Sequence, residues 1–499
     1  MQLFVNKMLF VALLLLGGLG MAQENVFLDR SYWKANPTLE KVKSDIALGN
    51  DPAELNGNAF DAVTWALIEK TDNVVVKFLL ELDGNGVNKL THDGRTYIFW
   101  AAYKDNLLMM HYLLDKGART DVIDSHGYSV MNFAAATGQK NPALYDFLIA
   151  QGADPKTEKN DDGANALLLL APFLEDDTMI DYFADKGLDP RSTDTKGNGL
   201  FNYAAKKGNI DFLTLLINKG MPYKSVNKEN GNAFIFASQG TRGSSNSLET
   251  YKYLEQLGIE PNITTDKGFT PLHALGYKNT DLKIFSYFIE KGVDVDQKDM
   301  NGNTAFINAA SRNALESVSF LAKHVKDINL ANNKGQSALT RAVSGNASEV
   351  VKMLLERGAQ TSGMDSEGNS MGYYLINSYR NDKASVFAEK LSLLSKAGLQ
   401  LDKTHAGGQT VWHLAVKKNN LNLLKQVAQW GASIDQKNDE GLTPLHLAAM
   451  KATDTDILKF LIQQGADKSI KTDFDETVMD IAKENELLKN HNTELSFLE

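Results

Sequence analysis

Short hydrophobic segments alternate with polar loops along most of the chain, and they come in pairs. The pattern is clearest in residues 441–467, GLTPLHLAAMKATDTDILKFLIQQGAD. Thr443 is a favourable helix N-cap and Pro444 suits the first helical position, so a short apolar helix is predicted to begin there. A polar turn separates it from a second helix with a wide apolar face, which ends before Gly465 in the left-handed position that follows many helices. Neither helix has enough partner surface to be stable alone, so each pair must stack on others like it.

Two series of glycines show that this pair of helices is repeated. The first series precedes the first helix of each repeat: Gly57, Gly94, Gly127, Gly163, Gly197, Gly231, Gly268, Gly302, Gly335, Gly368, Gly408 and Gly441. The second series follows the second helix of a repeat: Gly84, Gly117, Gly187, Gly258, Gly292, Gly358, Gly398, Gly431 and Gly465. Members of the first series are 33 to 40 residues apart, and each member of the second series precedes the next register position by 10 residues. We call the loop between the two series the finger.

The repeat resembles the ankyrin repeat. Thr270-Pro271-Leu272-His273 and Thr443-Pro444-Leu445-His446 match the T-P-L-H motif of that family in full, and Thr410-Val411-Trp412-His413 matches it in part. The resemblance covers about residues 49–482 and implies an all-α solenoid of about twelve helix-turn-helix units with finger loops. Several units depart from the pattern: Val325 replaces a closing glycine, Leu167–Leu170 replaces the usual first-helix sequence, and the step from Gly368 to Gly408 carries extra residues.

The resemblance divides the chain into four segments. Residues 23–56 are predicted to be an N-terminal capping half-repeat, because Pro37 begins a helix that Gly49 ends. Residues 57–471 form the array of about twelve repeats, in which Pro172 is expected to shorten the first helix of the fourth. Residues 472–499 begin a thirteenth unit, with Asp475 in the glycine register, and form a C-terminal capping helix segment.

Residues 1–22 have the composition of a cleavable secretory signal. Lys7 is the first charged residue, an apolar core runs from Met8 to Leu16, and Gly20 and Ala22 precede a cut before Gln23. An uncleaved anchor is the alternative, but the uncharged run from Met8 to Gln23 is 16 residues, short of the roughly 20 that span a bilayer. The mature chain is therefore expected to be exported, either periplasmic or secreted, with no membrane association after cleavage.

The composition of the chain excludes several classes of partner and chemistry. The chain carries a net charge of −10 and a pI near 5.5, which argues against nucleic acid as the main partner. It has no cysteine, which excludes disulfides, zinc-thiolate sites and thiol catalysis.

The sequence contains no motif of a catalytic or metal site. Three of the nine histidines hold the T-P-L-H position, where the resemblance implies a structural hydrogen bond, and His92, His126 and His405 lie in different fingers without a partner at metal-ligand spacing. An EF-hand with Gly302 at its sixth position fails, because Gln297 and Asn308 would hold its two ends. Residues 240–247 form a glycine-containing loop that lacks the ending of a phosphate-binding loop, so an exposed loop is the preferred interpretation. No catalytic residue, cofactor or metal is predicted.

The ends of the first helices are the main candidates for a partner-binding surface. The resemblance implies that partners contact the fingers and the two residues that end each first helix on the concave side. Six of ten such pairs contain Lys or Arg and none contains Asp or Glu. We therefore predict a basic strip with interleaved aromatic residues: Tyr103, Lys104, Phe173, Lys206, Lys207, Tyr277, Lys278, Arg312, Lys417, Lys418 and Lys451. The alternative is local, since a lysine at a helix C-terminus gains about 0.3–1 kcal/mol from the helix dipole.

The predicted function is non-catalytic protein binding. The chain is expected to be a monomer that presents a concave groove and finger loops to a protein partner, and the groove is expected to receive an acidic segment of that partner. A hidden enzyme would need a non-repeat block of roughly 100 residues, and no step of the first glycine series exceeds 40 residues. A chaperone-like helper or scaffold for an exported enzyme and a secreted, host-directed effector remain alternatives with the same fold.

Overall fold

The computed structural model describes residues 25–490 and 493–499. The predicted signal peptide, residues 1–22, lies outside the described residues. Within them, the regular structure is helical, and the only β-type pairings are isolated bridges such as the one between Ala331 and Ser337. The all-α repeat architecture predicted from the sequence is confirmed. The helices belong to two compact units, one that ends at Tyr223 and one that begins at Lys224.

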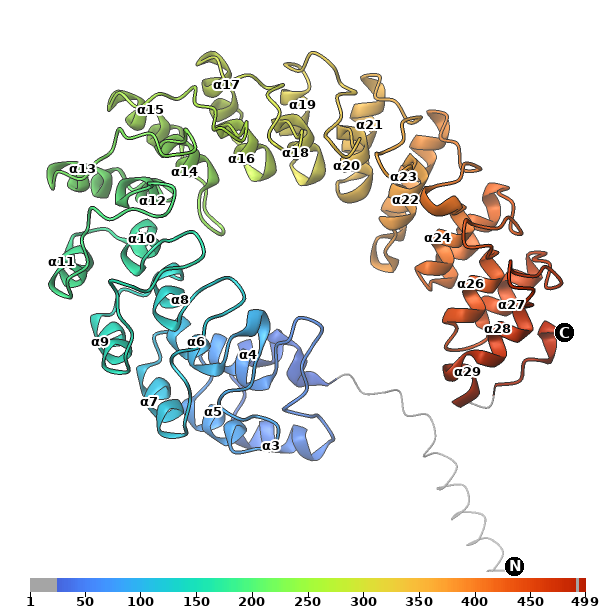
Figure 1. Cartoon of the computed structure of the whole chain (residues 1–499), viewed down its shortest axis with the longest axis horizontal. Helices are drawn as coiled ribbons and strands as arrows, with labels where there is room; N and C mark the ends of the chain where they lie inside the picture. Colours follow the sequence, from blue (N-terminus) through green and yellow to red (C-terminus); the bar gives the residue numbers. More distant parts are fainter. Residues whose placement is uncertain (1–24, 491–492) are drawn as a thin grey trace, which may run out of the picture. The chain divides into compact units, whose positions relative to one another are not determined.

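Each unit consists of stacked helix pairs, with the first helices in one row and the second helices in another (Figure 1). The first unit has these first helices: α4 (Ala62–Ile68), α6 (Tyr97–Tyr103), α8 (Val130–Ala136), α10 (Ala166–Leu170) and α12 (Leu200–Ala205). Its second helices are α5 (Asn73–Leu80), α7 (Leu107–Asp115), α9 (Pro142–Ala150), α11 (Thr178–Asp185) and α13 (Ile210–Asn218). As predicted, the helix before Pro172 is short, and the 3₁₀ turn η3 (Ala171–Phe173) follows it.

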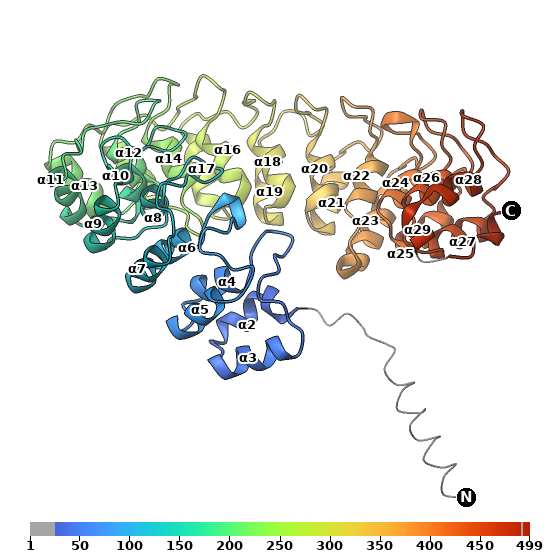
Figure 2. The same cartoon turned by 60° about the horizontal axis from the view of Figure 1, so that its bottom comes forward.

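The second unit repeats this arrangement eight times along the chain. Its first helices are α14 (Ala233–Gln239), α16 (Pro271–Lys278), α18 (Ala305–Arg312), α20 (Ala338–Gly345), α22 (Met371–Asn377), α24 (Val411–Lys417), α26 (Pro444–Lys451) and α28 (Val478–Glu484). Its second helices are α15 (Leu248–Gln256), α17 (Leu282–Glu290), α19 (Leu315–Leu321), α21 (Ser348–Glu356), α23 (Ala384–Lys396), α25 (Leu421–Val427), α27 (Asp456–Gln463) and α29 (Glu486–Asn490). Figure 2 shows the loops of this unit projecting from one end of the helix pairs.

The first helices stack closely because their facing residues are small. In α16, a Cβ atom at Gly276 would lie 2.5 Å from the carbonyl oxygen of Ala305 in α18, so the two backbones approach at a distance that only glycine permits. The amide of Asn313, which follows α18, spans the same junction and donates to the carbonyl oxygens of Gly276 and Asn279 at 2.7 and 2.9 Å. Close stacking thus buries the apolar faces and satisfies the helix-end carbonyls that would otherwise lack partners.

At several places along the array, neighbouring fingers are joined by a backbone hydrogen bond. The N–H of Ser125 donates to the carbonyl of Asp93 in the preceding finger at 2.9 Å, and Met300 donates in the same way to Lys267 at 2.7 Å. Within a finger, Asp124 accepts hydrogen bonds from the backbone of His126 and Tyr128 and so closes the turn. The acidic residues of the fingers are therefore turn formers, as the sequence indicates.

Two fingers differ from the predicted glycine register. In ten fingers, the left-handed residue is a glycine with φ between 66° and 88°. In the first repeat Ala59 (φ 58°) takes this position in place of Gly57, and in the sixth Asn230 (φ 60°) takes it in place of Gly231. Asp475 holds the position in the last finger with φ 63°, as predicted. Asn and Asp tolerate this conformation because their short side chains bond locally to the backbone.

The N-terminal segment holds more structure than a half-repeat. The turn η1 (Val26–Leu28) and the helix α2 (Arg30–Lys34) precede α3 (Leu39–Ala47), which is the one helix predicted there. Phe27 and Trp33 are fully buried, and the Trp33 indole donates to the carbonyl of Phe27 at 2.9 Å. Because α2 packs on α4 and α3 packs on α5, the two helices continue the rows of the first unit. A five-residue helix has too little periodicity to be seen in the sequence.

Candidate protein-binding surface

The described residues offer no obvious reaction centre. No three of their His, Asp or Glu side chains are grouped so that they could hold a metal ion. Among the described helices, none has the length and apolar character needed to cross a membrane. The candidate functional groups are the histidines, the ends of the first helices and the fingers.

The three histidines of the T-P-L-H position are structural. His413 lies fully buried in α24, where its Nδ1 atom accepts a hydrogen bond from the backbone N–H of Thr410 at 3.1 Å. Its Nε2 atom lies 2.9 Å from the carbonyl oxygen of Leu442 in the next finger. Burial lowers the pKa of His413, which favours the neutral ring that this arrangement needs. His273 makes the same bridge from Thr270 to the carbonyl of Asn303.

His405 is a buried histidine that sequence analysis placed in an ordinary finger. Its Nδ1 atom lies 3.2 Å from the hydroxyl oxygen of Ser370, the N-cap of α22. The Nε2 atom is buried and has no hydrogen-bond partner within the described part of the chain. Burial lowers the pKa of His405 to about 4, so the ring is neutral at ordinary pH.

The structure brings together His92 and His126, which the sequence assigns to separate fingers. The Nε2 atoms of both rings lie 3.3 Å from the Oδ2 atom of Asp93, and Arg95 donates to that same oxygen at 3.1 Å. Arg95 also pairs with the buried carboxylate of Asp124 at 2.7 Å. The carboxylate of Asp93 is thus occupied by the arginine, and the cluster ties the second finger to the third.

In the first unit, the predicted strip residues differ in their exposure. Tyr103 ends α6 and packs on Phe133 with a centroid distance of 6.0 Å, and Lys104 lies over the Tyr103 ring at 4.5 Å. Both side chains are half-buried, and burial lowers the pKa of Lys104. These two residues therefore form a partly covered aromatic–cation pair at the end of α6.

Phe173, Lys206 and Lys207 are neighbours at the ends of the first helices of the fourth and fifth repeats. A Cβ atom at Gly138 would lie 2.9 Å from the Phe173 ring, so Phe173 covers the turn of the preceding repeat. Lys206 is half-buried over Tyr203 at 5.0 Å, and burial lowers its pKa. Lys207 is exposed, with its Nζ atom 6.0 Å from the centroid of the Phe173 ring.

In the second unit, the remaining strip residues fall into two groups. Tyr277, Lys278 and Arg312 lie at the ends of the neighbouring helices α16 and α18, and Lys417, Lys418 and Lys451 lie at the ends of α24 and α26. The two helices between these groups, α20 and α22, end in Ser344-Gly345 and Asn377-Ser378. The basic strip is therefore interrupted within this unit.

The lysines of the second group have different tasks. Lys418 donates to the carbonyl oxygen of Asn377 at 3.2 Å and so caps the preceding helix α22. Lys417 and Lys451 are exposed and form no hydrogen bond or ion pair with any described residue. The local interpretation of these lysines as helix-end residues thus fits Lys418 well, while Lys417 and Lys451 remain available to a partner.

A comparison with known protein families identifies the repeat. A family model described as ankyrin repeats (3 copies) matches residues 63–159, 234–330, 272–365 and 382–472, which together make up more than half of the chain. The chain belongs to the ankyrin-repeat family. Its helix pairs are ankyrin repeats, and ankyrin repeats are modules for protein interaction.

Three relatives share parts of this ankyrin-repeat array. The chain is 37% identical over 75 residues to protein phosphatase 1 regulatory subunit 27 of Mus musculus (15% of this chain, 48% of that protein). It is 28% identical over 144 residues to palmitoyltransferase AKR1 of Lachancea kluyveri (28% of this chain, 19% of that protein). It is 22% identical over 345 residues to Rabankyrin-5 of Homo sapiens (61% of this chain, 28% of that protein). The matches cover less than half the length of each relative.

One ankyrin repeat carries a functional group that sequence analysis missed. Its second helix, α23, has 13 residues, and Lys390 projects from it into the array with only 4% of its surface exposed. The ammonium group donates to the carbonyl of Val343 at the end of α20, and burial lowers the pKa of Lys390 to about 8. A signal existed in the sequence, because Lys390 occupies an apolar position of the helix between Phe387 and Leu394.

Proposed function

We propose that this ankyrin-repeat protein is a non-catalytic module that binds a protein partner through the ends of its first helices and its fingers. The observation that carries the proposal is a difference between the apolar faces of the helices and the ends of the first helices. The apolar faces of the helices are used up in stacking, whereas Lys207, Lys417 and Lys451 stay exposed at the ends of first helices. Exposed cations on a chain of net charge −10 favour a partner with acidic groups.

The relatives support a binding role and also supply the main alternative. One of them is named as a regulatory subunit, and a regulatory subunit acts by association with another protein. Another is named as a palmitoyltransferase, but the match covers 19% of that protein, so the enzyme's name is not carried to this chain. The match to ankyrin repeats, which serve as interaction modules, supports the non-catalytic role.

Export is a second part of the proposal, and it rests on residues 1–22 alone. A charged residue, an apolar core and small residues before Gln23 favour cleavage and release to the periplasm or the medium. A helper for an exported enzyme and a host-directed effector are the alternative roles in that setting. Fractionation of the source cell distinguishes them, because an effector accumulates in the medium or in a second cell.

A crosslinked capture experiment tests the proposed function. The tagged mature chain is recovered from the envelope of its source cell beside a variant in which Lys206, Lys207, Lys417 and Lys418 are changed to Glu. We expect one dominant protein partner with the wild-type chain and its loss with the variant. A partner retained by the variant moves the contact to the fingers or the outer helices. No partner in the envelope, the medium or a second cell contradicts the proposal.

A further inference from the structure

The loop between α14 and α15 is more ordered than its sequence indicates. Thr241 and Ser244 exchange two backbone hydrogen bonds of 3.2 Å, which close a turn with Arg242 and Gly243 at its tip. The amide of Asn246, itself buried, donates to the carbonyl of Ala237 at 2.9 Å and fixes the loop to the end of α14. The predicted exposed loop is therefore a small hairpin with a defined position.

A lysine of the next repeat holds this hairpin in place. The Nζ atom of Lys278, at the end of α16, donates to the carbonyl oxygens of Thr241 and Ser244 at 3.1 and 3.5 Å. Gly240 leads into the hairpin with φ 62° and ψ −161°, a conformation open essentially to glycine. A Cβ atom there would lie 2.4 Å from the carbonyl oxygen of Ser244. These contacts hold the hairpin, with Arg242 at its tip, against the end of α16.

The same surface continues onto α18. Arg312 ends that helix, and its guanidinium carbon lies 6.0 Å from the centroid of the Tyr277 ring, which precedes Lys278 in α16. Arg242, Lys278 and Arg312 are exposed, and none of the three forms an ion pair with a carboxylate of the described residues. Tyr277 is half-exposed, and its hydroxyl group forms no hydrogen bond with a described residue. We call these four residues the hairpin patch.

The helix dipole explains only part of this patch. Lys278 and Arg312 lie in the last turns of helices, where the helix dipole favours a positive charge. Arg242 lies on a hairpin outside any helix, so the dipole gives no reason for its charge. Two unpaired guanidinium groups and a phenol hydroxyl are donors whose geometry suits carboxylates, since arginine binds them with two parallel hydrogen bonds.

We propose that the hairpin patch is the docking site for an acidic peptide segment, rich in Asp and Glu, of the protein partner. This inference rests on the proposed function for the existence of a partner and adds the place and chemistry of the contact. Arg242 and Arg312 bind carboxylates directly, Tyr277 donates from its hydroxyl group, and Lys278 adds positive charge while it positions the hairpin.

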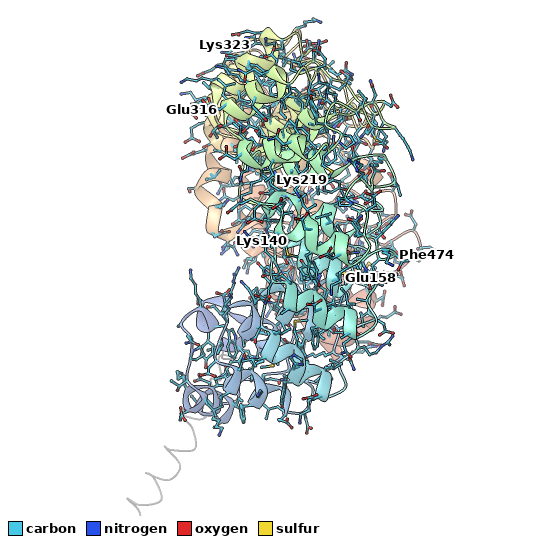
Figure 3. The ribbon with its side chains drawn as sticks, turned by 90° about the vertical axis from the view of Figure 1, so that its left-hand side faces the viewer. Lys140, Glu158, Lys219, Glu316, Lys323 and Phe474 are labelled. Atoms are coloured by element: carbon cyan, nitrogen blue, oxygen red, sulfur yellow. The ribbon has the colours of Figure 1, made fainter. Side chains whose placement is uncertain are left out.

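Fluorescence anisotropy with a labelled octaglutamate peptide and the full chain tests this site. We expect saturable binding, weakened at least tenfold by the double variant Arg242→Glu/Arg312→Glu. A matched control, Lys323→Glu/Lys352→Glu, makes the same change in net charge on exposed lysines at the second helices α19 and α21 of the same unit and is expected to bind within about twofold of the wild type. Figure 3 shows Lys323 pointing outward from the helices.

A second variant tests position rather than charge. Gly240→Ala displaces the hairpin without a change in charge, and we expect it to weaken octaglutamate binding several-fold while circular dichroism still shows the helical fold. The inference is overturned if the wild-type chain does not bind the peptide, or if the double variant and the control bind it alike. In either case, capture of a partner by the wild-type chain still supports the proposed function, so the two failures are distinguishable.

Discussion

The ammonium group of Lys390 lies 2.9 Å from the carbonyl oxygen of Val343, a residue 47 positions earlier in the chain. This contact caps the end of α20 with a charge from α23, the second helix of the next repeat. A buried ammonium is expensive unless it is hydrogen-bonded, and helix-end carbonyls are the partners that suit it. Because burial lowers the pKa of Lys390, the stability of the second unit is expected to depend on pH.

The first prediction concerns alkaline pH. Burial lowers the pKa of Lys390 to about 8, below its ordinary value of 10.5. Between these values the unfolded chain binds more protons than the folded chain, so this residue makes the free energy of unfolding rise with pH, by up to about 3 kcal/mol in total. Lys390→Met removes that contribution. The free energy of unfolding, measured by urea denaturation, is expected to rise less between pH 8 and pH 10 in the variant than in the wild type. An equal rise in both proteins contradicts the assignment.

The second prediction concerns acidic pH. Burial lowers the pKa of His405 to about 4, below the ordinary 6.5, so the neutral ring stabilises the fold at neutral pH. That stability is lost as the pH falls from 6.5 towards 4, because the unfolded chain takes up the proton first, and the loss amounts to about 3 kcal/mol. His273, His413 and His446 shift in the same direction. His405→Gln is expected to lose less stability between pH 7 and pH 4.5 than the wild type in thermal unfolding, and identical losses would exclude His405 as a contributor.

The third prediction tests the bridge made by a motif histidine. His413→Ala removes the acceptor for the Thr410 N–H and the partner of the Leu442 carbonyl, and leaves a cavity in a fully buried position. We expect a loss of about 2–4 kcal/mol in the free energy of unfolding. The exposed His324, whose ring packs on Phe320 of α19 and whose Nδ1 atom lies 3.0 Å from the Phe320 carbonyl oxygen, serves as the control, and His324→Ala is expected to cost less than about 0.5 kcal/mol.

The fourth prediction compares two helical glycines. Gly276→Ala places a Cβ atom 2.5 Å from the carbonyl oxygen of Ala305 and is expected to cost about 1–3 kcal/mol, because the stacked helices must separate. Gly372→Ala meets its nearest atom, the Ser370 hydroxyl oxygen, at 3.4 Å and is expected to be neutral or to stabilise by up to about 1 kcal/mol. Differential scanning calorimetry of both variants checks the order, and a reversal would show that the first helices are not closely stacked.

The repeat architecture could be predicted from the sequence because each repeat carries the same local signals. Thr443, Pro444 and Gly465 mark the ends of two helices, and their counterparts recur at a nearly constant spacing. Prediction failed where the local sequence carries too weak a signal. The helix α2 is too short for periodicity, and the shift of the left-handed residue to Ala59 and Asn230 depends on turn geometry that a count of glycines does not contain.

The candidate surface was predictable only as a set of positions. The helix ends that carry Lys207, Lys417 and Lys451 follow from the repeat register, and the structure finds these side chains exposed. Contacts between repeats were not predictable, because they join residues about one repeat or more apart: Lys278 to the hairpin at Thr241, Lys390 to Val343, and His126 to Asp93. The identity of the partner depends on the sequence and surface of a second protein.

The central claim is that the ends of the first helices bind a protein partner. Crosslinking mass spectrometry on intact source cells with an amine-reactive reagent tests it most directly, because the crosslinked peptides identify both the partner and the contact. The account predicts crosslinks to the partner from Lys207, Lys278, Lys417 and Lys451. Crosslinks confined to lysines of the second helices, such as Lys252, Lys352 and Lys459, would contradict it.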